Sequence, residues 1–569
     1  MNSIQQKLLY RYGGEDVSDL NKKKQARGIG GFMSGVLVLS LSTVIVKIIG
    51  LAVKIPMLAT LGAEGMGYFN SAYEIYALLC VISTAGLPVA LSMLVSAGRE
   101  KGDAVAVRRA YRSALALFLV LGALGSGIML IFSGQIAELV GNSEAQLCIV
   151  AISPALFFIC FSSAVRGYFQ GLENMMPTAV SQLIEAIGKL LFGVGFGVVA
   201  LRMGAELPFA AAMSVLGLTL GIFISSIYLF IVKTAKRTEY YSVRVARSER
   251  EGIIGTLLKI AVPITLSSAI LSFCRIIDMA LILRRLQSAG MSAADANGIY
   301  GSYTTLAVPV FALVPSLITP ISLSLVPRLS SAIAAGDTQG QAEVADRAQR
   351  LTVLLAMPAS MGITLYSKPI LSLLFSGQEE AVDIASPLLA VLGASVLFSG
   401  LITTTNAILQ SYRQTVKPIL SMVVGSAVKI ALAYILIGIP EVGVYGAPIS
   451  TLICNITVTV INLAFLGKRL PESDKLTGIE QTYLRPFFAS ALAIAASFAV
   501  YLGVFNAVEN MKLAFMAALP VAVGAYVCFA FLLRAVGRDE LMDIPMGSKL
   551  LVSYDKLKKL KYKNKTKDG

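Results

Sequence analysis

The sequence predicts an all-α polytopic membrane protein of about 14 transmembrane helices, with two parallel six-helix repeats around a central cavity and an additional C-terminal helix pair. The first observation is composition, since 56% of the 569 residues are hydrophobic and only 14% are charged, with a mean hydropathy of +0.75. The second is a series of apolar runs, each long enough to cross a bilayer at roughly 20 residues per crossing. The third is an internal repeat that divides most of these runs into two equal sets.

The apolar runs set the expected spans. The first set covers residues 32–60, 68–97, 110–132, 145–165, 177–201 and 207–232. The second set covers 256–283, 299–327, 349–375, 383–410, 417–438 and 444–467. A final pair covers 485–506 and 511–533. Glycine, proline, serine and threonine occur in nearly every run, as is typical of helices that pack closely or bend within transporters.

These spans define the expected domain organisation. We expect a cytoplasmic basic N-terminal segment (1–31), an N-terminal six-helix lobe (32–233), a cytoplasmic basic linker (234–255), a C-terminal six-helix lobe (256–467), an extra helix pair (468–535) and a cytoplasmic basic tail (536–569). The hydrophilic start is too long and too polar to be the lead of a signal peptide, so the first span is expected to be retained.

Basic residues in the connections predict the orientation of the chain. The segments 98–112 and 233–259 and the tail are rich in lysine and arginine, whereas 62–67, 133–142 and 438–443 contain almost none. Basic connections stay in the cytoplasm, so both termini are expected to be cytoplasmic. The formal charge of +15 admits nucleic acid as a partner, but a basic run beside a membrane is explained more simply by anionic lipid. We therefore expect membrane lipids, and no nucleic acid, as partners.

The internal repeat relates the two halves of the chain. Gly86-Leu-Pro-Val-Ala-Leu-Ser92 with Gly102-Asp103 recurs as Thr319-Pro-Ile-Ser-Leu-Ser324 with Gly336-Asp337. The offset between copies runs from 228 residues (Lys47 to Arg275) to 240 residues (Lys189 to Lys429). Each copy holds an even number of spans, so both copies enter the membrane in the same direction. Such parallel repeats place a substrate path between them.

Five basic residues lie inside the predicted spans. Lys47 and Lys54 are seven residues apart, almost two helical turns, so their ammonium groups point the same way about 10 Å apart. A lysine at the bilayer centre costs roughly 2.5–3.5 kcal/mol, which is tolerable if it faces a wet cavity or an anion. The candidate substrate-binding residues are Lys47, Lys54, Lys189, Arg275 and Lys429.

Three acidic residues in the spans, Glu74, Glu185 and Asp278, are candidates for ion coupling. Glu185 precedes Lys189 by four residues and Asp278 follows Arg275 by three, so each pair lies on one helix face. The alternative is that these are neutralised pairs that only orient helices. Glu74 is a counter-ion for Lys47 or Lys54, or a protonation site; the sequence leaves both open.

A cavity with net positive charge calls for an anionic cargo, and a phosphate or pyrophosphate group suits several converging cations. An exporter of organic cations would need an acidic cavity. Because the chain contains no histidine, a histidine proton relay and a histidine metal site are excluded. We expect no cofactor and no metal.

The first hundred residues resemble a known family. The carrying segments are Lys47-Ile-Ile-Gly-Leu-Ala-Val-Lys-Ile-Pro56, Leu61-Gly-Ala-Glu-Gly-Met-Gly-Tyr68, Ala72-Tyr73 with Tyr76, and Ser83-Thr-Ala-Gly-Leu-Pro-Val-Ala-Leu-Ser92. They are similar to the stage V sporulation protein B branch of the MurJ/MviN-like lipid II flippases, within the multidrug/oligosaccharidyl-lipid/polysaccharide exporter superfamily.

This resemblance implies a bacterial cell-membrane flippase that moves lipid II, or a related undecaprenyl-pyrophosphate-linked glycan, from the inner to the outer leaflet by alternating access. It implies roles in peptidoglycan or polysaccharide biosynthesis and sporulation, with a monovalent cation or proton as a further partner. Lys47 matches the first of two family arginines on the first helix and Arg275 a later one, whereas the second aligns at Val53, one place before Lys54. The pair at 485–533 resembles the family's groove for the lipid tail.

The sequence leaves other readings open. Within transport, these are an exporter of another lipid-linked polysaccharide unit or a drug/ion antiporter of the same superfamily. A membrane glycosyltransferase is disfavoured because the chain has no Asp-x-Asp motif and no histidine, so we expect that the protein is not an enzyme. A purely structural partner in sporulation or division would not need matched cations inside the membrane.

Overall fold

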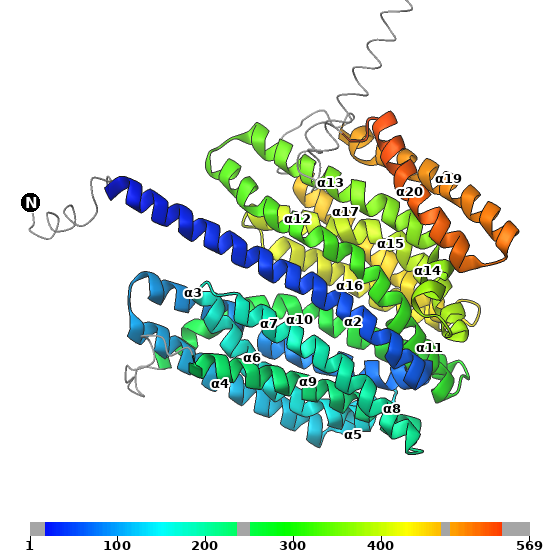
Figure 1. The fold of residues 1–569 in the computed structure, drawn as a ribbon, viewed down its shortest axis with the longest axis horizontal. Coiled ribbons are helices and arrows are strands. Elements are labelled where there is room, and N and C mark those ends of the chain that lie inside the picture. Colours follow the sequence, from blue (N-terminus) through cyan, green and yellow to red (C-terminus); the bar gives the residue numbers. More distant parts are fainter. Residues whose placement is uncertain (1–16, 236–250, 468–477, 537–569) are drawn as a thin grey trace, which may run out of the picture.

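The computed structural model describes residues 17–235, 251–467 and 478–536, which form a bundle of helices with no strand among them (Figure 1). The all-α fold predicted from the apolar runs is confirmed. Much of the predicted basic N-terminal segment, linker and tail falls at 1–16, 236–250 and 537–569, outside the described residues.

The first half of the chain ends at residue 235. Its elements are α2 (Val17–Thr84), α3 (Leu87–Glu100), α4 (Ala104–Ile131), α5 (Ser133–Leu139), η1 (Ser143–Ala145), α6 (Gln146–Gly171), α7 (Met176–Gly188), η2 (Lys189–Gly193), α8 (Val194–Arg202) and α9 (Leu207–Ala235). The element η2 is a single π-helical turn that continues α7 into α8.

The second half has the same general layout. Its elements are α10 (Glu251–Ser288), α11 (Ala293–Ser302), η5 (Tyr303–Ala307), α12 (Val308–Ala334), α13 (Thr338–Leu365), α14 (Ser367–Leu374), α15 (Glu379–Ser411), α16 (Val416–Ile437), η6 (Gly443–Tyr445) and α17 (Gly446–Gly467). The C-terminal part consists of η7 (Glu480–Leu484), α19 (Arg485–Val508) and α20 (Met511–Leu532), an antiparallel pair beside α13 and α14 (Figure 1).

Twelve helices of the described chain are long and apolar enough to cross a membrane. The longest, Ile45–Glu100, includes a break at Gly62, where φ is 67°. Only glycine adopts this left-handed conformation without a steric cost, so α2 divides there between the predicted spans 32–60 and 68–97. The helix resumes at once after the break, so residues 63–67 of the predicted connection are helical. The count of fourteen spans stays a prediction.

The repeat is visible in local structure. Gly102 and Gly336 both have a positive φ, of 66° and 68°. Each is followed by an aspartate that begins the next helix: Asp103 accepts from the backbone N–H of Ala106, and Asp337 from that of Gly340, both at 2.9 Å. Such caps satisfy a backbone donor that the helix leaves free. The copies of Gly-Asp found in the sequence thus start equivalent helices, α4 and α13.

Small residues let helices of the first half approach closely. A Cβ added at Gly188 of α7 would lie 2.6 Å from the Cα of Gly221 on α9. Close backbone contact of this kind is how helices associate in a membrane, where burial of apolar surface provides no drive. Large apolar side chains such as Leu124, Ile131 and Leu191 remain exposed on the outside of the bundle, as expected for a surface facing lipid.

The two halves meet along α2 and α10. The second segment of α2 packs against α11, and α10 contacts α2, α3 and α16. In Figure 1, α3, α4, α6, α7 and α9 lie together on one side of α2, and α12, α13, α15, α16 and α17 lie on the other. In this view the segment of α2 before Gly62 runs between the two groups.

Candidate functional site

A cavity of about 580 Å³ lies where α2, α6, α7, α9 and α12 converge. The first half supplies most of its wall, including every charged residue in it: Lys47, Lys54, Glu74, Arg166, Glu185 and Lys189. The second half supplies Thr304, Val308, Pro309, Ala312, Leu313 and Ser316. The described wall therefore carries four basic and two acidic side chains.

Lys47 and Lys54 both line this cavity, on the face of α2 that their spacing predicts. Lys47 is exposed and makes no hydrogen bond or ion pair with the described residues. Lys54 is partly buried, and its Nζ donates to the backbone oxygen of Thr304 at 2.8 Å. One lysine is therefore available to a ligand, and the other is held by the opposite half.

Thr304 belongs to the π-helical turn η5. Such turns interrupt the regular hydrogen bonding of a helix and are frequent at functional sites. The Oγ1 of Thr304 donates to Tyr300 O at 2.7 Å and accepts from Asn70 at 3.0 Å, while Asn70 also donates to Thr305 Oγ1 at 2.7 Å. η5 thus presents a carbonyl and two hydroxyls to side chains of α2.

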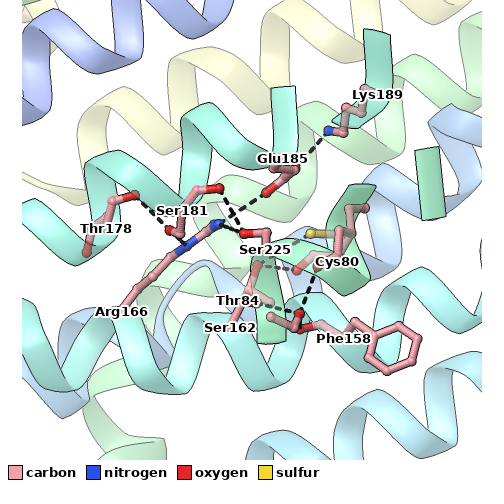
Figure 2. Close-up of polar contacts among 12 residues, drawn as sticks. Cys80, Thr84, Phe158, Ser162, Arg166, Thr178, Ser181, Glu185, Lys189 and Ser225 are labelled. Carbon is pink, nitrogen blue, oxygen red and sulfur yellow. Dashed lines mark hydrogen bonds and ion pairs between the residues drawn. The ribbon is translucent and has the colours of Figure 1, made fainter. Parts of the chain in front are cut away.

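Figure 2 shows a second group of charges in the first half, built around Glu185 of α7. Its Oε1 lies 2.8 Å from Lys189 Nζ, and its Oε2 lies 3.1 Å from Arg166 Nη2. Arg166 also donates through Nε to Ser181 Oγ at 2.9 Å. The predicted Glu185–Lys189 pair is confirmed. Arg166, on α6, was not among the predicted site residues, because the fourth span was expected to end at 165.

Arg275 and Asp278 share a face of α10 but do not pair. Arg275 Nε lies 3.4 Å from Glu74 Oε2 on α2, and its Nη2 donates to Ser272 Oγ at 2.9 Å. Asp278 instead forms an ion pair with Lys429 of α16. The pairing predicted from their spacing is therefore wrong, because α10 lies between α2 and α16, and each side chain reaches a different neighbour.

The predicted site residues thus fall into two sets. Lys47, Lys54, Glu74, Glu185 and Lys189 line the cavity. Arg275, Asp278 and Lys429 lie outside its wall, although Arg275 reaches it through its pair with Glu74. The described wall gains Arg166 and therefore has a surplus of two positive charges, all from the first half.

Two family models match the chain. The one described as polysaccharide biosynthesis protein matches residues 32–333, and MatE matches 263–435. Stage V sporulation protein B of Bacillus subtilis (strain 168) is 26% identical over 92% of this chain and 99% of its own length. Lipid II flippase MurJ of the same organism is 24% identical over 89% and 97%.

The fold is also that of a solved structure. Lipid II flippase MurJ in an inward closed conformation superposes with a TM-score of 0.67 at 17% identity, over 87% of this chain and 98% of that one. The resemblance seen in the first hundred residues therefore extends through the chain. With more than half of its length matched by one model, this chain belongs to the polysaccharide biosynthesis protein family and is a membrane transporter of the multidrug/oligosaccharidyl-lipid/polysaccharide exporter superfamily.

Proposed function

We propose that this protein is a flippase that moves lipid II, or a related undecaprenyl-pyrophosphate-linked glycan, from the inner to the outer leaflet of the bacterial cell membrane. The observation that carries the proposal is the charge of the cavity between the two halves. Four basic and two acidic side chains line it, and the most accessible, Lys47, makes no bond with the described residues. An anionic headgroup satisfies this surplus, whereas an organic cation would be repelled.

Each basic residue has a role in the proposal. Lys47 and Lys54 bind the pyrophosphate as point charges, and Arg275 joins them from the second half. Lys189 and Lys429, each held by a carboxylate, support the site from further away. The names of the two flippase and sporulation relatives support a lipid-linked cell-wall precursor as cargo.

Transport proceeds by alternating access, with the lobes 32–233 and 256–467 rocking about the cavity while both termini stay in the cytoplasm. Glu74, Glu185 and Asp278 are the candidate ion-coupling sites, for a proton or a monovalent cation. The membrane potential contributes as well, since moving one charge through it is worth about 2.3 kcal/mol per 100 mV.

A second candidate cargo is another lipid-linked polysaccharide unit, and a third activity is drug/ion antiport. The polysaccharide biosynthesis match over 32–333 supports the second cargo, and the MatE match over 263–435 supports antiport. Competition by defined lipid-linked glycans in a reconstituted flipping assay separates them. In a flippase, only the glycan that the protein carries slows the movement of labelled lipid II. In a drug antiporter, none of the glycans changes transport.

The direct test measures access of external probes to lipid II in cells depleted of the protein. Wild type, Lys47→Ala and Lys101→Ala are supplied in turn, Lys101 being an exposed lysine of the α3–α4 turn that does not line the cavity. We expect wild type and Lys101→Ala to restore access and Lys47→Ala to leave lipid II trapped inside. Equal rescue by all three would remove Lys47 from the site. Undisturbed access in depleted cells would point to another lipid-linked glycan as the cargo, or to a redundant flippase that masks the loss.

A further inference from the structure

The two halves are joined by a buried group of polar contacts at the end of the cavity marked by Gly62. Asn297 of α11 donates through Nδ2 to the backbone oxygen of Glu64 at 2.7 Å. Its Oδ1 accepts from Asn142 Nδ2 at 2.8 Å, and Asn142 also donates to Ser71 at 2.9 Å. Asn297 is 1% exposed and Asn142 6%. We call Glu64, Ser71, Asn142 and Asn297 the outer seal, because the predicted orientation places this end outside.

The backbones are also in direct contact within the seal. A Cβ added at Gly301 would lie 1.9 Å from the carbonyl oxygen of Ala63, and one added at Gly67 would lie 2.4 Å from that of Asn297. Opening this end therefore requires α11 to move away from α2 as a unit. The halves also meet toward the other end, where the Gly86 N–H donates to Thr265 Oγ1 at 3.2 Å and a Cβ added at Gly86 would lie 2.1 Å from the carbonyl oxygen of Ala261.

The seal continues along one helix face to the cavity. Asn297, Gly301 and Thr304 are separated by four and three residues, so they lie on one side of the α11–η5 helix. Thr304 is the residue whose backbone oxygen accepts from Lys54, and its neighbour Thr305 accepts from Asn70. Lys54 is thus the one basic residue of the described cavity wall that is bonded to the second half.

We propose that Lys54 couples cargo binding to the outer seal: its bond to Thr304 helps to close the empty cavity, and the cargo's phosphate takes over the ammonium and so loosens the seal. This inference rests on the proposed function for the identity of the cargo. The bond from the Lys54 ammonium to the Thr304 carbonyl is an ion–dipole contact, whereas a phosphate adds the attraction between two opposite charges. The phosphate therefore competes successfully for the same N–H groups.

The test measures access to the cavity from outside. A single cysteine replaces Gly50, which lines the cavity and whose added Cβ would have no atom within 4 Å, in a chain whose six native cysteines are replaced. Intact protoplasts are treated with a membrane-impermeant maleimide, and the labelled fraction is compared among Lys54→Met, Lys47→Met and the parent. Membrane insertion is quantified for each, and Lys54→Gln and Asn297→Ala provide second variants.

Without added cargo, we expect Lys54→Met or Lys54→Gln and Asn297→Ala to raise labelling at least threefold. Lys47→Met removes the same charge from the cavity without a bond to the second half, so its labelling should stay well below that of the Lys54 variants. Parental labelling in the Lys54 variants would overturn the proposal. So would an equal rise in Lys47→Met, because the effect would then come from lost cavity charge.

A second arm adds a short-chain polyprenyl pyrophosphate. In the parent, labelling should rise toward the level of Lys54→Met, while Lys54→Met itself should not respond. An equal rise in labelling of both proteins would show that the anion opens the seal without Lys54. It would overturn the proposed exchange, in which the Lys54 ammonium leaves Thr304 for the phosphate. No change of labelling in the parent would count against both the exchange and the proposed cargo. Raised labelling of Lys54→Met before the anion is added would still assign Lys54 to the seal.

Discussion

Arg275 of α10 reaches across the molecule to Glu74 of α2, with 3.4 Å between Nε and Oε2, rather than to Asp278 three residues further along its own helix. The pair therefore joins the two halves of the chain beside the cavity that Glu74 lines. The Arg275 side chain is 53% exposed and that of Glu74 is 23% exposed, so solvent screens the arginine end of the pair, which contributes about 0.2–1 kcal/mol to stability. We therefore expect the pair to matter for transport more than for folding.

Charge reversal tests this pair. Glu74→Arg alone brings two cations together and Arg275→Glu alone two carboxylates, so each should reduce flipping more than tenfold while the melting temperature stays close to that of wild type. The double variant restores an ion pair of opposite direction and should recover part of the activity. A double variant as inactive as the singles would show that the two residues do not act as a pair.

Glu185 should matter for stability. Removing it leaves Arg166 and Lys189 without their carboxylate, and these side chains are only 12% and 23% exposed. Loss of one partner from a buried ion pair costs about 3–5 kcal/mol, so Glu185→Ala should unfold at a clearly lower temperature in detergent.

Glu173 provides the matched control for Glu185. It pairs with Arg99 at 2.9 Å, but the two side chains are 46% and 41% exposed. Glu173→Ala should therefore cost about 1 kcal/mol or less. Equal losses of stability in the two variants would contradict the burial of the Glu185 group.

Asp278 and Lys429 should be energetically coupled. A double-mutant cycle with Asp278→Leu and Lys429→Met compares the two single variants with the double variant. Each single change leaves a partly buried charge without its partner, whereas the double change removes both. We expect the double variant to unfold at a higher temperature than either single variant. Strictly additive losses would mean that the two residues stabilise the fold independently.

The close crossing of α7 and α9 predicts that glycine-to-alanine substitutions at two positions change stability in opposite directions. Gly188→Ala places a methyl group 2.6 Å from a backbone carbon of Gly221, which should destabilise the protein by about 1–3 kcal/mol through overpacking. Gly195→Ala, in α8, meets no atom within 4 Å and should stabilise by up to about 1 kcal/mol, since alanine is the better helix former. Thermal unfolding of both variants measures the change in stability. Destabilisation of both would show that local packing is not the cause of the loss in Gly188→Ala.

Local sequence patterns predicted the helices, the repeat and the Glu185–Lys189 pair, because each depends on residues close together in the chain. The Gly-Asp copies at 102–103 and 336–337 predicted equivalent helix starts for the same reason. Arg166 was missed because it lies one residue beyond the expected end of the fourth span, and its partners Ser181 and Glu185 lie on another helix. Spacing placed Arg275 and Asp278 on one face correctly, but it carries no information about which helices flank that face.

The unequal division of charge between the halves has a mechanical consequence. All four basic residues of the described cavity wall lie on the first half, while the second half contributes only hydroxyl, backbone and apolar atoms. In the proposed mechanism, an anion bound there would keep its ionic ligands of the first half while the halves rotate relative to each other, and only its contact with Arg275 would be remade. We therefore expect reorientation of a bound headgroup to be fast.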